Sequence, residues 1–384
     1  MKLENRSEYS ARLSRFTKAV SLEVPDRIPV EVIFDATFCI QYAGYPLTEG
    51  TWDISKAGAA VEKCFADFEF DYCRNFTFRS PHFYKALGAR TFVQSKEGYM
   101  QHPEVHGLEP EEYREFIERP FACLVEKILP RLYTELDQPK PYNMVAMAKA
   151  IHVANSVVGR YRDMQISVAD RYGVPMVTSG AIEAPMDFIA DFIRGFSGIS
   201  IDIRRCPDEV EAACEVAMQL MIKKGMMVKP GITSQIFIPL HMPAFLREQH
   251  FARFYWPTFK KMVTTLADAG HYFYIFFEGD WARYYDYLQE LPAKRIVAKM
   301  EYGVPKLAKE KLGKTMSITG FFPLSLLASG TQQDCVNKAA ELVDALAAGG
   351  GYLFSTDKNC IALSDIRMEN YNAVIEYLHK HGQY

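Results

Sequence analysis

The feature that most constrains the fold is an alternation of short apolar runs and helical segments, which begins at Val174 and continues to the C-terminus. Six apolar runs of strand length each precede a segment in which apolar residues recur at helical spacing. The runs are PMVTSG, GITSQIFI, YFYIFFEG, RIVAKM, MSITGF and GYLFST, and the predicted helices span 185–195, 246–269, 281–290, 304–312, 332–348 and 366–381. This alternation is typical of βα units that build a parallel sheet. It fits a closed barrel or a doubly wound open sheet.

The region after the first predicted strand favours the barrel. That strand, VEVIF at 30–34, is followed by DATFCIQYAG and not by the GxGxxG motif of a nucleotide-binding open sheet. Helical spacing is also found in the first 20 residues, near 54–68, and over most of 111–172. We therefore predict a (β/α)8 TIM barrel with extra N-terminal helices. Because no Ser/Gly-rich linker divides the chain, we expect one domain over 1–384, with 1–25 as a helical extension.

Composition and charge exclude several classes of partner. The 384 residues are 49% hydrophobic, which allows a large core, and 44 basic against 47 acidic residues leave a net charge of -3. No excess of positive charge is present to bind nucleic acid or an anionic membrane. The N-terminus lacks the apolar run of a signal peptide, and the eight scattered cysteines form no CxxC pair. We expect a cytoplasmic protein with reduced thiols.

Polar residues that end the predicted strands are the candidates for the functional site, because catalytic groups of a parallel barrel lie at the C-terminal ends of its strands. The candidates are Asp35, Glu183, His241, Glu278, Glu301, Asp357 and Cys360. Glu278 follows six apolar or aromatic residues, so burial should raise its pKa unless a cation or a metal ion holds the carboxylate. We predict catalytic roles for Glu278, Glu183 and Asp35, and substrate binding by Glu301 and Asp357.

Three of these candidates are of the types that bind zinc. Histidine, carboxylate and thiolate are zinc donors, and a catalytic zinc usually has three protein ligands and one open position. His241, Glu278 and Cys360 are therefore the predicted metal ligands. They lie far apart in the sequence, so this prediction depends on the barrel bringing their strand ends together.

Several segments, in order, resemble the uroporphyrinogen decarboxylase superfamily, including its corrinoid-dependent methyltransferase branch. They are PDRIPVEVIFDATFCIQYAG, AFLREQHFARFYWPTFKKMV, YFYIFFEGD, ITGFFPLSLLASGTQQDCVNKAAELVDALAAGGGYLFSTD and MENYNAVIEYLHKHG. The resemblance implies a TIM barrel with its pocket at the C-terminal ends of the strands. Decarboxylases of this superfamily carry an arginine-rich R-Q-A-G-R segment for the acidic side chains of a tetrapyrrole. Here FDATFCIQYAGY contains no arginine, which favours the methyltransferase branch.

In that branch the resemblance implies a zinc site formed by a His-x-Cys-Gly segment and a later cysteine. The matching segment here is FFEG, with Phe276 at the histidine position and Glu278 at the cysteine position. The later cysteine matches Lys358, and Cys360 matches only after a shift of two residues. A carboxylate ligand makes zinc harder and favours an oxygen or nitrogen methyl donor.

The resulting hypothesis is a zinc-dependent methyltransferase. Zinc held by Glu278 and two of His241, Cys360 and Glu301 would polarise a small methyl donor, such as a methoxy-aromatic compound or a methylamine. The methyl group would pass to a corrinoid on a separate protein, since the chain has no D-x-H-x-x-G corrinoid motif. The resemblance also implies a possible homodimer.

Two other functions stay open. A cofactor-free decarboxylase acting on a different carboxylate substrate would need cations in the pocket, for which Arg27, Arg74 and Arg79 are candidates. A barrel used for binding, or for a different lyase reaction, would have a pocket without converging acids.

Overall fold

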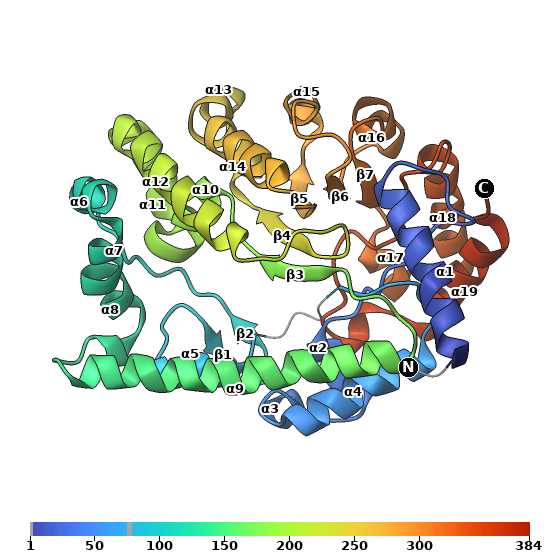
Figure 1. Cartoon of the computed structure of the whole chain (residues 1–384), viewed down its shortest axis with the longest axis horizontal. Coiled ribbons are helices and arrows are strands. Elements are labelled where there is room, and N and C mark those ends of the chain that lie inside the picture. The colour runs from blue at the N-terminus through green and yellow to red at the C-terminus, as the bar shows by residue number, and fades with distance from the viewer. Residues whose placement is uncertain (1–2, 75–78) are drawn as a thin grey trace.

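Eight parallel β segments close into a ring in the computed structural model, which describes residues 3–74 and 79–384 (Figure 1). Five of them are regular strands that pair in chain order, and the other three are joined to the ring by isolated parallel bridges. The strands are β3 (Thr178–Ala181), β4 (Gln235–Leu240), β5 (Phe273–Asp280), β6 (Ile296–Tyr302) and β7 (Ser317–Gly320). The bridges are Glu31 to Tyr72, Cys73 to Met176, Ile318 to Tyr352 and, closing the ring, Val30 to Phe354. The predicted (β/α)8 barrel is confirmed.

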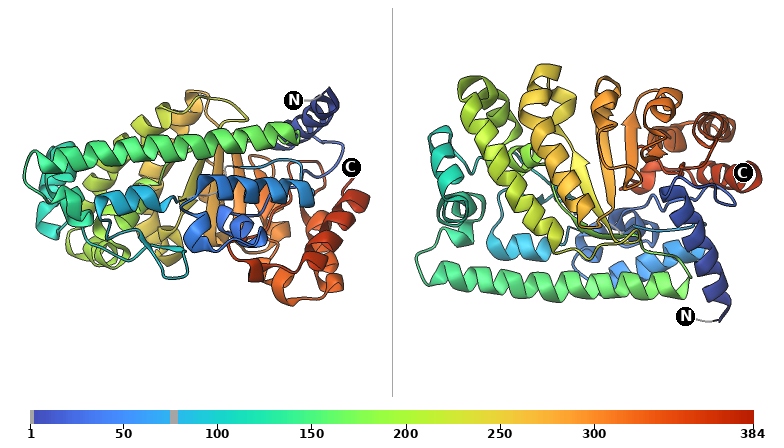
Figure 2. Two further views of the ribbon diagram at one scale, coloured as in Figure 1. Left: turned by 90° about the horizontal axis from the view of Figure 1, so that it is seen from below. Right: turned by 45° about the horizontal axis from the view of Figure 1, so that its top comes forward.

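Helices that follow the strands cover the outside of the barrel (Figures 1 and 2). Their bounds are α10 (Pro185–Phe188), α11 (Phe196–Arg205), α12 (Pro207–Met226), α13 (Glu248–His250), α14 (Trp256–Asp268), α15 (Tyr285–Leu288), α16 (Pro305–Leu312), α17 (Leu324–Ser329), α18 (Gln332–Leu346) and α19 (Met368–His381). The longer ones, such as α12, α14 and α18, bury one face and expose the other, as their sequence periodicity predicts. The predicted helices agree with these bounds within a few residues, whereas α11, α12 and α17 were not predicted.

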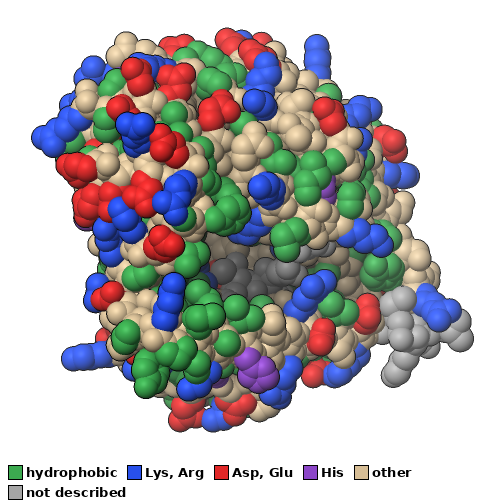
Figure 3. All heavy atoms as spheres, turned by 60° about the vertical axis from the view of Figure 1, so that its left-hand side comes forward, with side chains coloured by type: hydrophobic (Ala, Val, Ile, Leu, Met, Phe, Trp, Pro, Cys, Tyr) green, Lys and Arg blue, Asp and Glu red, His purple; other side chains and the backbone are tan. Residues whose placement is uncertain are grey.

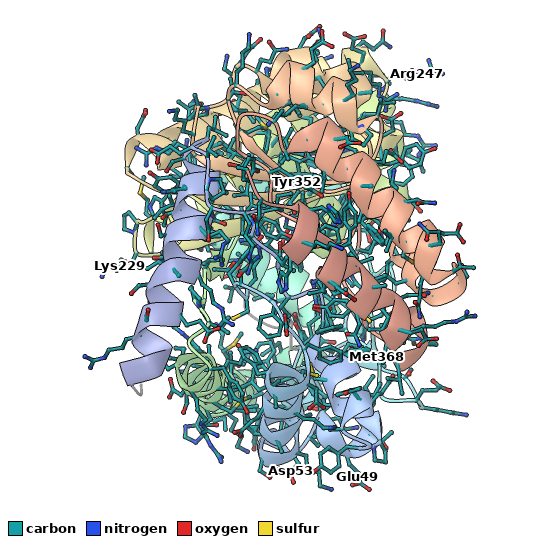
Figure 4. All side chains as sticks on the ribbon, turned by 90° about the vertical axis from the view of Figure 1, so that its right-hand side faces the viewer. Glu49, Asp53, Lys229, Arg247, Tyr352 and Met368 are labelled. Atoms are coloured by element: carbon teal, nitrogen blue, oxygen red, sulfur yellow. The ribbon has the colours of Figure 1, made fainter. Side chains whose placement is uncertain are left out.

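The first 172 residues add helices and a hairpin around the barrel. They contain α1 (Leu3–Val20), α2 (Ala36–Tyr42), α3 (Leu47–Gly50), α4 (Ile54–Asp67), α5 (Pro81–Leu87), the hairpin β1 (Val93–Gln94) and β2 (Met100–Gln101), α6 (Tyr113–Glu118), α7 (Pro120–Cys123), α8 (Leu129–Leu132) and α9 (Tyr142–Arg171). The helical region expected over 111–172 is interrupted before α9, because Pro120 and Pro130 stand in the first turns of separate short helices. Figure 4 shows Glu49 and Asp53 at one end of the molecule and Arg247 at the opposite end.

Alternate residues of the strands point into the barrel and form layers. The register pairs Tyr274 with Val297 and, one layer further along, Phe276 with Lys299. Because side chains alternate along a strand, Glu301 on β6 lies one layer beyond Lys299. The polar residues at the ends of β5 and β6 thus lie beyond barrel layers that are mostly aromatic and aliphatic.

Helix α1 closes the N-terminal end of the barrel. Phe16, Ala19 and Val20 are fully buried in one cluster with interior residues of the strands, including Tyr274 and Val297. Ser317 donates its hydroxyl to the carbonyl groups of Ala19 and Val20, at 3.0 and 3.2 Å. The barrel interior is therefore accessible from its C-terminal end. Among the described residues, no helix has the length and apolar character needed to span a bilayer.

Candidate functional site

A cavity of about 330 Å³ lies at the C-terminal ends of the strands. Acids, histidines, cations and aromatic rings all contribute to its wall. They are Glu183, Asp191 and Glu278; His102 and His241; Arg79, Lys299 and Lys358; and Phe192, Phe237, Tyr274 and Phe276, with Pro239, Asn359 and Ile361 completing the lining. Figure 3 shows a hollow in one face of the molecule, with hydrophobic and basic side chains around it. The mixture suits a small ligand with an aromatic or aliphatic body and polar ends.

His241 lies between two carboxylates at the end of β4. Its Nδ1 is 2.8 Å from Oδ2 of Asp191, and its Nε2 is 3.2 Å from Oε1 of Glu278. Burial disfavours the charged ring, but the hydrogen bonds with Asp191 and Glu278 outweigh it and raise the pKa of His241 to about 11. The site therefore holds an imidazolium flanked by two acids at neutral pH.

Asp187 fixes the backbone that carries His241. Its carboxylate, which is fully buried, accepts hydrogen bonds from the backbone N–H groups of His241 and Met242, at 3.3 and 2.8 Å, and from the Tyr255 hydroxyl at 2.6 Å. Asp187 and Asp191 are one helical turn apart, so they face the end of β4 together. Asp191 lies in a π-helical segment, Ile189–Arg194, a distortion that often accompanies functional sites.

Glu183 is the cavity residue best suited to donate a proton. Burial, followed by the nearby charge of Asp191, raises the pKa of Glu183 to about 7. Its Oε2 is buried and has no hydrogen-bond partner within the part of the chain that the structure describes. A carboxyl group with a pKa near neutrality is half protonated at physiological pH, which is the condition that favours general acid catalysis.

Lys299 brings a positive charge to the floor of the cavity. Its side chain is 2% exposed, and Nζ donates to Oδ1 of Asn359 at 2.7 Å. Asn359 in turn donates Nδ2 to Oδ1 of Asp35 at 3.1 Å. Burial lowers the pKa of Lys299. Asp35, predicted as catalytic, therefore acts on the cavity through Asn359 and does not line it.

Glu183, His241 and Glu278 line the cavity as predicted from the sequence, and the other four candidates do not. Glu301 accepts a hydrogen bond from the Gly279 N–H at 2.7 Å and pairs with Lys358 at 2.7 Å. Asp357 accepts from the N–H groups of Leu324 and Lys358, at 2.8 and 2.7 Å. Both acids thus hold the loops around the cavity.

Cys360 is not brought to His241 and Glu278. It pairs with Phe34 of the first β segment, it is fully buried, and its thiol donates to the Ala362 carbonyl at 3.5 Å. Burial raises the pKa of this thiol far above its usual value, so it is held in the protonated form. Cys360 is a packed core thiol in this arrangement.

The residues present do not form the three-ligand zinc site that was expected. His241 Nε2 and Glu278 are adjacent donors, and the bond from Asp191 to the other ring nitrogen is of the kind that orients metal-binding histidines. However, the described residues contain no group of three His, Cys, Asp or Glu side chains placed to hold a metal ion. Zinc at this site stays a prediction.

Sequence reasoning missed Asp187, Asp191, Lys299 and Asn359. Asp187 and Asp191 could have been found, because they are spaced by four in the helical segment that follows a predicted strand. Lys299 is the single charged residue in the apolar run IVAKM, at 296–300, which is a further signal. Asn359 carries no such signal, because its role depends on the loop after the last strand.

Comparison with known proteins identifies a family and a structural neighbour. The family model described as uroporphyrinogen decarboxylase matches residues 139–381. A solved structure of a methyltransferase from Methanosarcina mazei is similar to the chain with a TM-score of 0.60 and 14% sequence identity, covering 95% of this chain and 97% of that one. No curated protein sequence matches. At this identity the neighbour shows a shared fold.

Proposed function

The chain belongs to the uroporphyrinogen decarboxylase family, and from this premise we propose that it is a methyltransferase. It would move a methyl group from a small O- or N-methyl donor to a corrinoid carried by a separate protein. The barrel shared with the Methanosarcina mazei methyltransferase supports this proposal. So does the arginine-free segment after the first β segment, which does not suit a tetrapyrrole with many carboxylates.

The observation that carries the proposal is the buried Glu183 carboxyl group at the cavity wall. Removing a methyl group from an ether or an amine leaves an electron pair on the oxygen or nitrogen, and this atom must be protonated for the product to leave. Glu183, with a pKa raised to about 7, can supply the proton at neutral pH.

The proposed step transfers one methyl group and one proton. The acceptor supplies the electron pair of the new bond to the methyl carbon, and the pair of the broken C–O or C–N bond stays on the donor heteroatom. That atom takes the proton of Glu183, which leaves the residue as a carboxylate. When the corrinoid is docked, it supplies the nucleophile, and solvent returns the proton to Glu183.

His241 would stabilise the charge that develops in this step. As an imidazolium it is positive, and the hydrogen bonds with Asp191 and Glu278 fix the plane of its ring. A fixed positive group near a developing alkoxide or phenoxide lowers the barrier more than a mobile one, because it needs no reorganisation.

The competing functions have less support. A decarboxylase was expected to use Arg27, Arg74 and Arg79, but Arg27 pairs with Asp71 and Arg74 pairs with Glu31, so of the three only Arg79 lines the cavity. A purely binding barrel was expected to lack converging acids, whereas three acids converge here.

Methyl transfer to free cob(I)alamin tests the proposal. The purified chain is incubated under reducing, oxygen-free conditions with cob(I)alamin and either 4-methoxybenzoate, methoxybenzene or methylamine. We expect one of these donors to lose its methyl group, detected as the demethylated product and as the loss of cob(I)alamin absorbance. No transfer from any donor, together with CO2 release from 4-methoxybenzoate, would replace the proposal by the decarboxylase.

A further inference from the structure

The buried cations of the chain differ in whether a carboxylate pairs with them, and this difference indicates what the ligand is. Arg15, Arg74 and Arg194 are each 9% exposed or less, and each contacts a buried carboxylate, from Asp71, Glu31 and Asp202 respectively, at 2.6 to 2.9 Å. Lys299 is more deeply buried than all three, yet the described residues give it no ion pair. A buried charge is costly unless it is paired, and an anionic ligand at Nζ would stabilise the charged form of Lys299.

The position of Lys299 shows where that anion would sit. Lys299 is paired in register with Phe276, and both side chains point into the barrel and line the cavity. Nζ lies 5.1 Å from the centre of the Phe276 ring and donates one hydrogen bond, to Asn359. An ammonium group has three N–H donors, so two remain for a ligand at the cavity floor.

The charges around Lys299 favour a ligand group with a single negative charge at that position. Glu183, Asp191 and Glu278 already face the same cavity. Arg79, His241 and Lys358 face it too, but His241 lies between Asp191 and Glu278, and Lys358 pairs with Glu301. A phosphate ester, with nearly two negative charges, would bring more charge beside these acids than Lys299 by itself neutralises. A carboxylate matches the single charge of Lys299.

The aromatic residues in the cavity wall indicate that the body of the ligand is an aromatic ring. Phe192, Phe237, Tyr274 and Phe276 give the cavity four aromatic rings, and its volume of about 330 Å³ admits one ring with small substituents. Aromatic side chains favour the stacked or edge-on packing of another ring.

We propose, on the basis of the methyltransferase function argued above, that the methyl donor is an aromatic monocarboxylate whose carboxylate binds Lys299 at the cavity floor. Glu183 and His241 then act at the methoxy end of the molecule. Lys299 is a specificity-determining residue in this arrangement, since it selects acidic donors over neutral ones.

Calorimetric titration without cobalamin tests binding separately from methyl transfer. The ligands are 4-methoxybenzoate and its uncharged analogue 4-methoxybenzamide, and the proteins are wild type, Lys299→Met and Lys309→Met. Lys309 is the matched control, because it is a partly buried lysine whose Nζ bonds to the Gly350 carbonyl and which does not line the cavity. Thermal unfolding of each variant verifies folding.

We expect wild type and Lys309→Met to bind 4-methoxybenzoate with similar affinity, and Lys299→Met to bind it about tenfold to about a hundredfold more weakly, as expected for a charge-assisted hydrogen bond. The benzamide should bind weakly to all three. Equal binding of acid and amide to wild type, or unchanged benzoate binding by Lys299→Met, would overturn the inference. Binding of 4-methoxybenzoate that depends on Lys299, without methyl transfer, would retain the inference and reject the proposed function. Rapid demethylation of methoxybenzene, which has no carboxylate, would support the proposed function and reject the inference.

Discussion

Nε2 of His241 lies 3.2 Å from Oε1 of Glu278, on the edge of the imidazole opposite the one that Asp191 contacts. The two residues come from the ends of neighbouring parallel strands, β4 and β5, which is how a barrel brings together groups that are distant in sequence. The contact places a positive and a negative group side by side at the cavity wall.

Replacing Glu183 should remove the proton donor of the reaction. We expect Glu183→Gln to lower kcat about a hundredfold or more, the usual size of a general acid effect. In wild type the protonated form acts, so kcat should be high below pH 7 and fall as the pH rises through the pKa of about 7. The pH profile of kcat measures this. Glu290→Gln, which changes a surface acid paired with Lys260, is the control and should keep the wild-type profile.

Asp191 should keep His241 charged into the alkaline range. In Asp191→Asn a hydrogen bond and a negative charge are lost, so the pKa of His241 should fall from its raised value of about 11. Because the charged ring exists below that pKa, the variant should lose the imidazolium at lower pH than wild type. NMR titration of the histidine ring protons measures the shift. An unchanged His241 titration would show that Asp191 does not set its charge.

Metal analysis decides the zinc prediction. Any stoichiometric zinc should disappear in Glu278→Ala and persist in Cys360→Ser, because Glu278 contacts His241 at the cavity whereas Cys360 is packed in the core. Mass spectrometry of protein purified without chelator gives the zinc content per chain. Loss of zinc in Cys360→Ser would restore the ligand set expected from sequence, and no metal in wild type would reject zinc.

Asp71 should contribute strongly to stability at the base of the barrel. Its side chain is almost fully buried and accepts from Arg15, Arg27 and the backbone N–H of Val30, at 2.6 to 2.8 Å. Asp71→Ala leaves Arg15 buried with fewer partners, so the free energy of unfolding should fall by about 3–5 kcal/mol. Urea unfolding measures the change. Asp26→Ala, at a carboxylate that is 62% exposed and also pairs with Arg15, should cost about 1 kcal/mol or less.

Residue periodicity predicted the barrel because the strands from β4 to β7 are continuous apolar runs with regular helices between them. It could not find the second β segment, where only Tyr72 and Cys73 form bridges, since two residues carry no pattern. Nor did it predict the hairpin β1 and β2, whose strands have two residues each.

For the site, the search for polar residues at strand ends correctly placed Glu183, His241 and Glu278 at the cavity. The same search wrongly placed Cys360 there as a metal ligand. A position after a strand gives the correct end of the barrel, yet the side chain there can face either the cavity or the next layer of core. Cys360 faces the core because it extends the parallel pairing with the first β segment at Phe34. Asp191 and Lys299 acquire their roles from partners on other elements, which no local pattern encodes.

The closure of the barrel base by α1 has a kinetic consequence for the proposed reaction. Among the described residues, Phe16, Ala19 and Val20 fill the N-terminal end of the barrel, so the donor, its demethylated product and the methyl acceptor would all use the opening at the C-terminal end. An acceptor carried by a bulky protein blocks this opening while it is docked. Turnover should therefore follow a compulsory order, in which the small donor enters first and its product departs last, and product inhibition patterns would report that order.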